Sequence, residues 1–147
     1  MATTATVTLA SDISSGYAGY TNTMTLTKAD TLNDIEETTG FSRRKLAATT
    51  AVDLIRMADA SLLQETADAK SAKVFVQNVG DGKGNIDKST YVTISIGDTG
   101  GTPQEIGRLY GGDWMMFPVT GADDKDVVAA PSTNDAVVLE YVMFFEV

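Results

Sequence analysis

The amino-acid sequence predicts an all-β protein, an antiparallel β-sandwich with jelly-roll or Greek-key connections and one or two short helices. Apolar and polar residues alternate with a period of two in several segments, and turn residues recur about every 8–12 positions. The chain has 147 residues, 43% of them apolar, which suffices for one compact domain. We expect a single domain over 1–147, with 1–40 as an N-terminal arm or additional strands.

The first thirty residues have the pattern of two threonine-faced strands. Positions 4, 6 and 8 are threonine and alternate with apolar residues. Over 21–28 the odd positions are threonine, whereas Met24 and Leu26 take the opposite face. Because threonine is β-branched and polar, it suits the face of a strand that meets water. The segment 14–20, rich in Ser, Gly and Tyr, is expected to join the two strands.

Two segments depart from the period of two. Residues 31–37 begin with threonine and carry acidic residues in their first turns, which favours a short helix. The apolar residues at the start of 51–70 fit a helical spacing and also fit a strand. We expect a strand over 51–57 and a short helix or a loop over 59–68.

The second half of the chain is expected to form hairpins. Strands at 74–76 and 91–96 flank a long tip, Gly80–Lys88, and the even-numbered residues of 91–96 should point inward. Strands at 105–110 and 113–119 are joined by a Gly-Gly pair, which tolerates the positive φ angles of a two-residue type I′ turn.

The second hairpin predicts specific neighbours. Its register places Leu109, Trp114 and Met116 on one face, in the core. It also places Ile106 opposite Phe117, and the same register brings Arg108 within ion-pair reach of Asp113.

The last strand has the strongest pattern. All odd-numbered residues of 137–147 are apolar, whereas the even-numbered ones are a mixture of apolar residues and glutamate. The odd-numbered residues are therefore expected to face the core, and the strand should run the length of the sandwich.

Composition excludes several classes of function. The chain lacks cysteine and histidine, which removes disulfides, thiolate chemistry and the commonest general base. Its net charge is −9, and the second half is the more acidic, so we expect no nucleic-acid partner. No apolar stretch approaches the length of a membrane span, and the first residues do not resemble a signal peptide. We therefore expect no membrane partner and synthesis in a cytoplasm.

Three polar segments are candidate chemical sites. The loop Gly80–Lys88 lacks the glycine spacing of a phosphate loop and is expected to be a hairpin tip. Asp81, Asn85 and Asp87 are spaced loosely like the ligands of a calcium loop, which leaves a bound cation as the alternative. The acidic residues of 123–126 are expected to be solvated in a turn. Serine and threonine lack the partners that activate a nucleophile. The sequence therefore predicts no enzyme, no cofactor and no metal.

The basic run Arg43-Arg44-Lys45 could dock an acidic partner surface.

Residues 41–147 resemble a family of small tailed-bacteriophage virion proteins. The resemblance lies in the order of Lys73–Asn78, a Gly/Asp tip, Tyr91–Gly97, Ile106–Trp114 and the final strand at Glu140–Phe145. It also includes the Phe-Pro pair at 117–118. β-Sandwich proteins with this order of features are encoded near phage head and tail genes.

The resemblance implies a structural role in the virion. It implies a capsid decoration (cement) protein that binds between major capsid protein subunits, most often as a homotrimer. Residues on mixed strand faces and the basic run then become the expected partner contacts: Arg43, Arg44, Lys45, Tyr110, Val138, Val142 and Phe144.

Two other roles in a virion are alternatives to that of a capsid decoration protein. One is a component of the neck or tail. The other is a receptor-binding or carbohydrate-binding module, because jelly-roll sandwiches often present aromatic residues to sugars. Tyr17, Tyr20 and Trp114 are the aromatic candidates, and Trp114 is expected to be buried.

Overall fold

The computed structural model describes residues 3–9, 20–26, 37–38, 40–57, 71–120 and 125–145, and all the regular structure within them is β-strand. The strands are β1 (Thr3–Leu9), β2 (Tyr20–Leu26), β3 (Glu37–Thr38), β4 (Ser42–Leu46), β5 (Val52–Ile55), β6 (Ser71–Asn78), β7 (Tyr91–Ile96), β8 (Gln104–Tyr110), β9 (Trp114–Thr120), β10 (Val127–Pro131) and β11 (Val137–Phe145).

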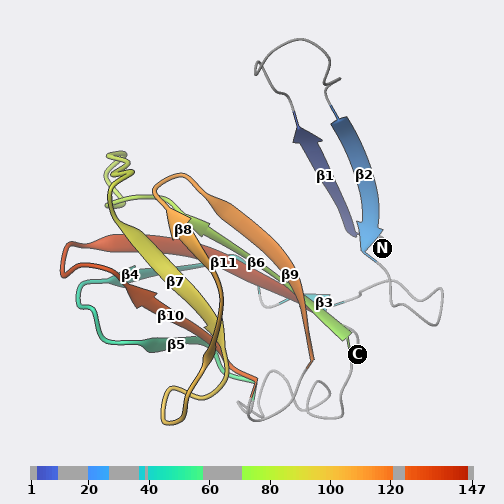
Figure 1. Ribbon diagram of the computed structural model, residues 1–147. Helices are drawn as coiled ribbons and strands as arrows, with labels where there is room; N and C mark the ends of the chain where they lie inside the picture. Colours follow the sequence, from blue (N-terminus) through green and yellow to red (C-terminus); the bar gives the residue numbers. More distant parts are fainter. Residues whose placement is uncertain are drawn as a thin grey trace.

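Two antiparallel sheets form a sandwich (Figure 1). The four-stranded sheet has the order β5-β10-β7-β8. The five-stranded sheet has the order β3-β11-β6-β9, and β4 also pairs with β11. Four of the antiparallel pairs are nested along the chain: β4 with β11, β5 with β10, β6 with β9 and β7 with β8. Successive nested pairs alternate between the two sheets.

The threonine-faced strands are confirmed as β1 and β2, which pair only with each other in the described part of the chain. Their register places threonine opposite threonine at three positions: Thr4 with Thr25, Thr6 with Thr23 and Thr8 with Thr21. The period of two in each strand produces this match, because a shift of one residue would set threonine opposite the intervening residues.

The segments expected to form short helices, 31–37 and 59–68, lie almost entirely outside the described residues. Glu37 lies in β3, where it pairs with Phe145. The strand expected over 51–57 is confirmed as β5, which supplies the buried residues Leu54 and Ile55.

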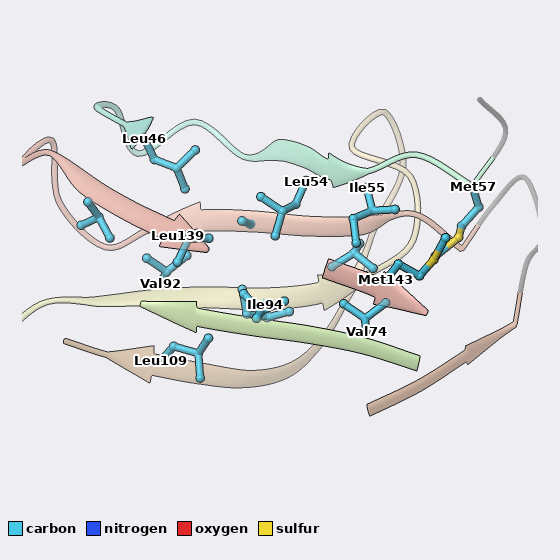
Figure 2. Close-up of a cluster of buried hydrophobic side chains, with 14 of the residues drawn as sticks. Leu46, Leu54, Ile55, Met57, Val74, Val92, Ile94, Leu109, Leu139 and Met143 are labelled. Atoms are coloured by element: carbon cyan, nitrogen blue, oxygen red, sulfur yellow. The ribbon is translucent and has the colours of Figure 1, made fainter. Parts of the chain in front are cut away.

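The core lies between the two sheets and is built from the alternating faces of their strands (Figure 2). Leu139 and Met143 of β11 are fully buried, as are Val92 and Ile94 of β7, which confirms the inward faces predicted for both strands. Ser95 is also buried, contrary to expectation. The extra residue at the irregularity between β7 and β8 is Ile106 of β8, so β7 keeps its alternation, and Ser95 lies opposite the buried Val128 of β10.

Both predicted hairpins of the second half are wrong. The strands at 74–76 and 91–96 lie in different sheets, and so do β8 and β9, so each connection crosses the sandwich. A sequence pattern shows where a chain turns, but the partner of each strand depends on which sheet the chain enters after the turn.

The neighbours predicted from the second hairpin change accordingly. Leu109 is buried as expected, whereas Trp114 is 48% exposed and Met116 is half-buried on the outer face of the five-stranded sheet. Ile106 is exposed at the bulge of β8. Arg108 forms an ion pair with Glu105, with 2.9 Å between Nε and Oε1, instead of Asp113.

The buried side chain of Asn78 links the two sheets where the chain crosses between them. Its Nδ2 donates to the carbonyl of Leu109 in the facing sheet at 3.0 Å, and its Oδ1 accepts from the N–H of Gly80 at 3.0 Å. Its backbone also pairs with Gly112 and Asp113 at the second crossing. A single buried amide therefore satisfies backbone groups of both connections.

The loop between β6 and β7 packs back on the sandwich through glycine. Gly80 has a φ of 76°, and a Cβ there would lie 2.1 Å from the carbonyl oxygen of Asn85. Gly82 has a φ of 77°, and a Cβ would lie 2.7 Å from Cγ2 of Val138. The loop therefore covers part of β11 only because these positions lack side chains.

We expect Asn78→Leu to lower the free energy of unfolding by about 1–3 kcal/mol, because it leaves the Leu109 carbonyl and the Gly80 N–H buried without their partner. Urea denaturation measures this change. Gln77→Leu is the matched control, since that neighbouring side chain lies on the outer face, half-buried. Equal stability of N78L and Q77L would contradict the role of Asn78.

A second prediction concerns the loop between β6 and β7. Gly80→Ala should destabilise the protein by about 1–3 kcal/mol more than Gly84→Ala. Both glycines have a positive φ, but a Cβ at Gly84 meets nothing within 4 Å, so the difference isolates the contact with Asn85. Thermal unfolding of both variants gives the comparison, and indistinguishable midpoints would refute the close packing.

Candidate interaction surface

The outer face of the five-stranded sheet carries a row of aromatic side chains across its strands. In the register, Phe75 of β6 lies between Val142 of β11 and Met116 of β9. Phe41 precedes β4, whose first residue, Ser42, pairs with Tyr141, so Phe41 reaches the Val142 side of the same row. These side chains lie on the face opposite the core because their strand neighbours point inward.

Three rings of this face are in contact, and we call Phe41, Phe75 and Trp114 the aromatic row. The ring centroids of Phe41 and Phe75 are 6.3 Å apart, in an edge-to-face arrangement, and those of Phe75 and Trp114 are 6.0 Å apart. Phe41 is 74% exposed and Trp114 is 48% exposed, whereas Phe75 between them is half-buried. The aromatic row therefore presents apolar surface to solvent.

Two predicted partner contacts are not exposed. Val138 and Val142 are 5% and 1% exposed, although both lie on the outer face of β11. Val138 is covered by the loop at Gly82, and Val142 lies in the row between Phe41 and Phe75. Phe144 is half-buried. Val138 and Val142 are therefore not available as partner contacts, because the loop covers the first and aromatic side chains flank the second, neither of which the sequence of β11 reveals.

The basic run lies on β4, and its three members differ in role. The Nε of Arg43 donates to Oε1 of Glu140 on the paired strand at 2.9 Å. Arg44 lies on the opposite side of β4 and donates from its guanidinium to the carbonyl oxygen of Asp53 in the facing sheet. Lys45 is exposed on the outer face, opposite Val138. Arg43 and Lys45 thus follow Phe41 along the outer side of β4, at one end of the aromatic row, while Arg44 bridges the two sheets at the edge.

Tyr110 lies apart from this surface, on the four-stranded sheet. It is 39% exposed, and its ring centroid is 5.4 Å from that of Tyr91 on the paired strand. The guanidinium of Arg108 lies 4.8 Å from the centroid of the Tyr91 ring. The residues expected to meet a partner are therefore divided between the two outer faces of the sandwich.

The loop Gly80–Lys88 uses its carboxylates to hold its own backbone. Asp81 accepts hydrogen bonds from the N–H groups of Lys83 and Asn85 and from Nδ2 of Asn85. Asp87 accepts from the N–H and hydroxyl of Ser89. The Asn85 and Ser89 side chains, respectively, are the main cause of the lowered pKa of Asp81 and Asp87. These carboxylates act as turn acceptors.

A buried carboxylate near the start of β10 was missed at the level of sequence. Asp126 is 7% exposed, and its Oδ1 accepts from the N–H of Met57 at 2.8 Å. Burial raises the pKa of Asp126, and the nearby carboxylates of Asp53 and Asp98 act in the same direction. Asp53 accepts from Nε of Arg56 through Oδ2, whereas its buried Oδ1 has no hydrogen-bond partner within the described ranges.

The expectation of a solvated acidic turn over 123–126 is therefore wrong for Asp126, and 123–124 lie outside the described residues. Within the described ranges, no three His, Cys, Asp or Glu side chains are grouped so that they could hold a metal ion. Nor does that part of the chain contain a helix of the length and apolarity needed to cross a membrane.

Comparisons with known proteins identify no family. No family model matches the chain, and no curated protein matches it. Among solved structures, it is similar to a chain from Bacillus endospore appendages, which are described as a novel family of disulfide-linked pili. The TM-score is 0.41 at 16% identity, over 80% of this chain and 97% of the other. This chain contains no cysteine.

We expect Asp126→Asn to stabilise the protein at neutral pH, because asparagine keeps the acceptor for Met57 and removes a charge that burial disfavours. The folded pKa is raised above the ordinary 3.8, so wild-type stability falls as pH rises from about 3.8 through the folded pKa. The advantage of D126N should therefore be complete above this window and absent below it.

Urea midpoints measured across a pH series test this dependence. Asp135→Asn, which changes an exposed carboxylate, serves as the control. A D126N protein that is less stable than wild type at pH 7 would contradict the prediction and show that the charged carboxylate of Asp126 stabilises the fold.

Proposed function

We propose that this chain is a non-enzymatic structural protein of a tailed-bacteriophage virion, and specifically a capsid decoration protein that binds between major capsid protein subunits. The observation that carries the proposal is the exposed aromatic row on a sheet face, with Arg43 and Lys45 at one end of the row. Trp, Tyr, Phe and Arg are enriched in the cores of protein interfaces. The sequence resemblance to phage virion proteins indicates that the virion is the assembly in which such an interface would be used.

The proposal includes a jelly-roll topology. The nested pairs from β4 with β11 to β7 with β8 alternate between the two sheets, as they do when one long antiparallel ribbon is wrapped over a sandwich. Double-sheet jelly rolls occur in viral capsid and lectin domains. Strand order thus supports the finer fold assignment, but fold alone does not specify function.

The proposed assembly is a homotrimer in the virion. The virion itself would be assembled in the host cytoplasm. Several weak contacts made at once by linked copies give a high overall affinity without any large single interface. A neck or tail component is the alternative within the virion, and it differs in copy number.

A glycan-binding module is a second candidate, because Trp114 is exposed and not buried as expected. An indole face beside a phenyl ring is a surface on which a sugar ring can stack. Tyr17 lies outside the described residues. Titration with glycans distinguishes this candidate, since it requires Trp114 to respond to a sugar and the decoration role does not.

Quantitative mass spectrometry of particles purified from the host that encodes this chain tests the proposed function. We expect many copies per particle, in a fixed ratio to the major capsid protein, on heads with or without tails. A few copies, lost together with the tail, would instead identify a neck or tail component. Particles that lack the chain altogether would contradict any role in the virion.

A further inference from the structure

We propose that the outer face of the five-stranded sheet binds an acidic protein segment that presents apolar side chains to the aromatic row. This inference rests on the proposed function, because it specifies the chemistry of the partner that the face would meet in a shell. It is argued from the spacing of the rings and from the distribution of charge.

The aromatic row matches the repeat of an extended chain. Successive ring centroids along Phe41, Phe75 and Trp114 are 6.3 and 6.0 Å apart. Side chains on one face of an extended segment recur about every 6.6 Å, at every second residue. An extended segment with alternating apolar residues can therefore place successive side chains against successive rings.

The charge of this face is opposite to that of the chain. On the outer sides of β4, β9 and β11, the described charged residues are Arg43 and Lys45 against Glu140, which is ion-paired with Arg43; Lys73 of β6 also has an interaction partner. Lys45 therefore gives these strands a surplus of one positive charge, in a chain of net charge −9. Within a Debye length of about 8–10 Å, this surplus favours a partner that carries carboxylates.

Two other occupants fit less well. A symmetric contact between two copies through this face would bring identical patches together, and therefore like charges. A nucleic acid would meet the cations but also the field of an acidic protein, and the ring spacing would go unexplained. An acidic protein segment satisfies both the apolar and the electrostatic character of the face.

Fluorescence titration of the full chain tests the proposal, because Trp114 is its single tryptophan. The probe is a synthetic peptide of alternating leucine and glutamate. We expect a saturable blue shift as the exposed indole becomes covered, and binding that weakens with added salt. The same peptide with lysine in place of glutamate should give no shift.

Variants locate the binding on the face. Phe41→Ser and Lys45→Glu should each weaken peptide binding by about tenfold or more, as for central interface residues. Ile86→Ser and Lys88→Glu are the matched controls, since both residues are exposed in the loop between β6 and β7. These controls should bind the peptide as wild type does.

Several results would overturn the proposal: no shift at about 1 mM acidic peptide, equal binding of the lysine peptide, or equal losses in the control variants. Blocking of Trp114 by self-association, detected by sedimentation, would assign the face to a second copy. Preferential binding of DNA would assign it to nucleic acid. None of these results bears on the number of copies of the chain in particles, which tests the proposed function separately.

The proposed function fails independently of this inference. If particles contain the chain but Phe41→Ser is incorporated normally and the peptide does not bind, only the assignment of this face is wrong. If particles lack the chain and the peptide binds as described, the face still recognises acidic segments, but its partner lies outside a virion.

Discussion

The buried amide of Asn78 is the constraint on which both crossings of the sandwich depend. The chain leaves the five-stranded sheet after β6 and returns to it before β9, and each crossing leaves backbone groups away from solvent. Asn78 satisfies groups in both places, through its side chain to Leu109 and Gly80 and through its backbone to Gly112 and Asp113. Because unsatisfied buried groups are costly, alternative crossings are disfavoured.

The same crossings create the exposed aromatic row. β9 follows the second crossing and pairs with β6, which brings Trp114 next to Phe75 on the outer face. Had β8 and β9 formed a hairpin in one sheet, Trp114 would share the face of Leu109 and be buried. The exposed aromatic row is thus a consequence of strand order, and its neighbouring cations follow from the pairing of β4 with β11.

The two outer faces of the sandwich differ in character. The five-stranded sheet presents aromatic rings with cations beside them, whereas the four-stranded sheet presents Tyr91 and Tyr110 with the Glu105–Arg108 ion pair. Exposed ion pairs contribute little to stability, so this second face has the chemistry of an ordinary solvated surface.

The sequence by itself determined most strands and the inward faces of β7 and β11, because the period of two is a local property of the backbone and of side-chain polarity. It also revealed the basic run of β4. Only the tertiary structure decided that Trp114 is exposed, that Val142 is covered and that Asp126 is buried. These outcomes depend on which strands become neighbours across and between sheets. That choice is made by long-range pairing and packing, which no local pattern encodes.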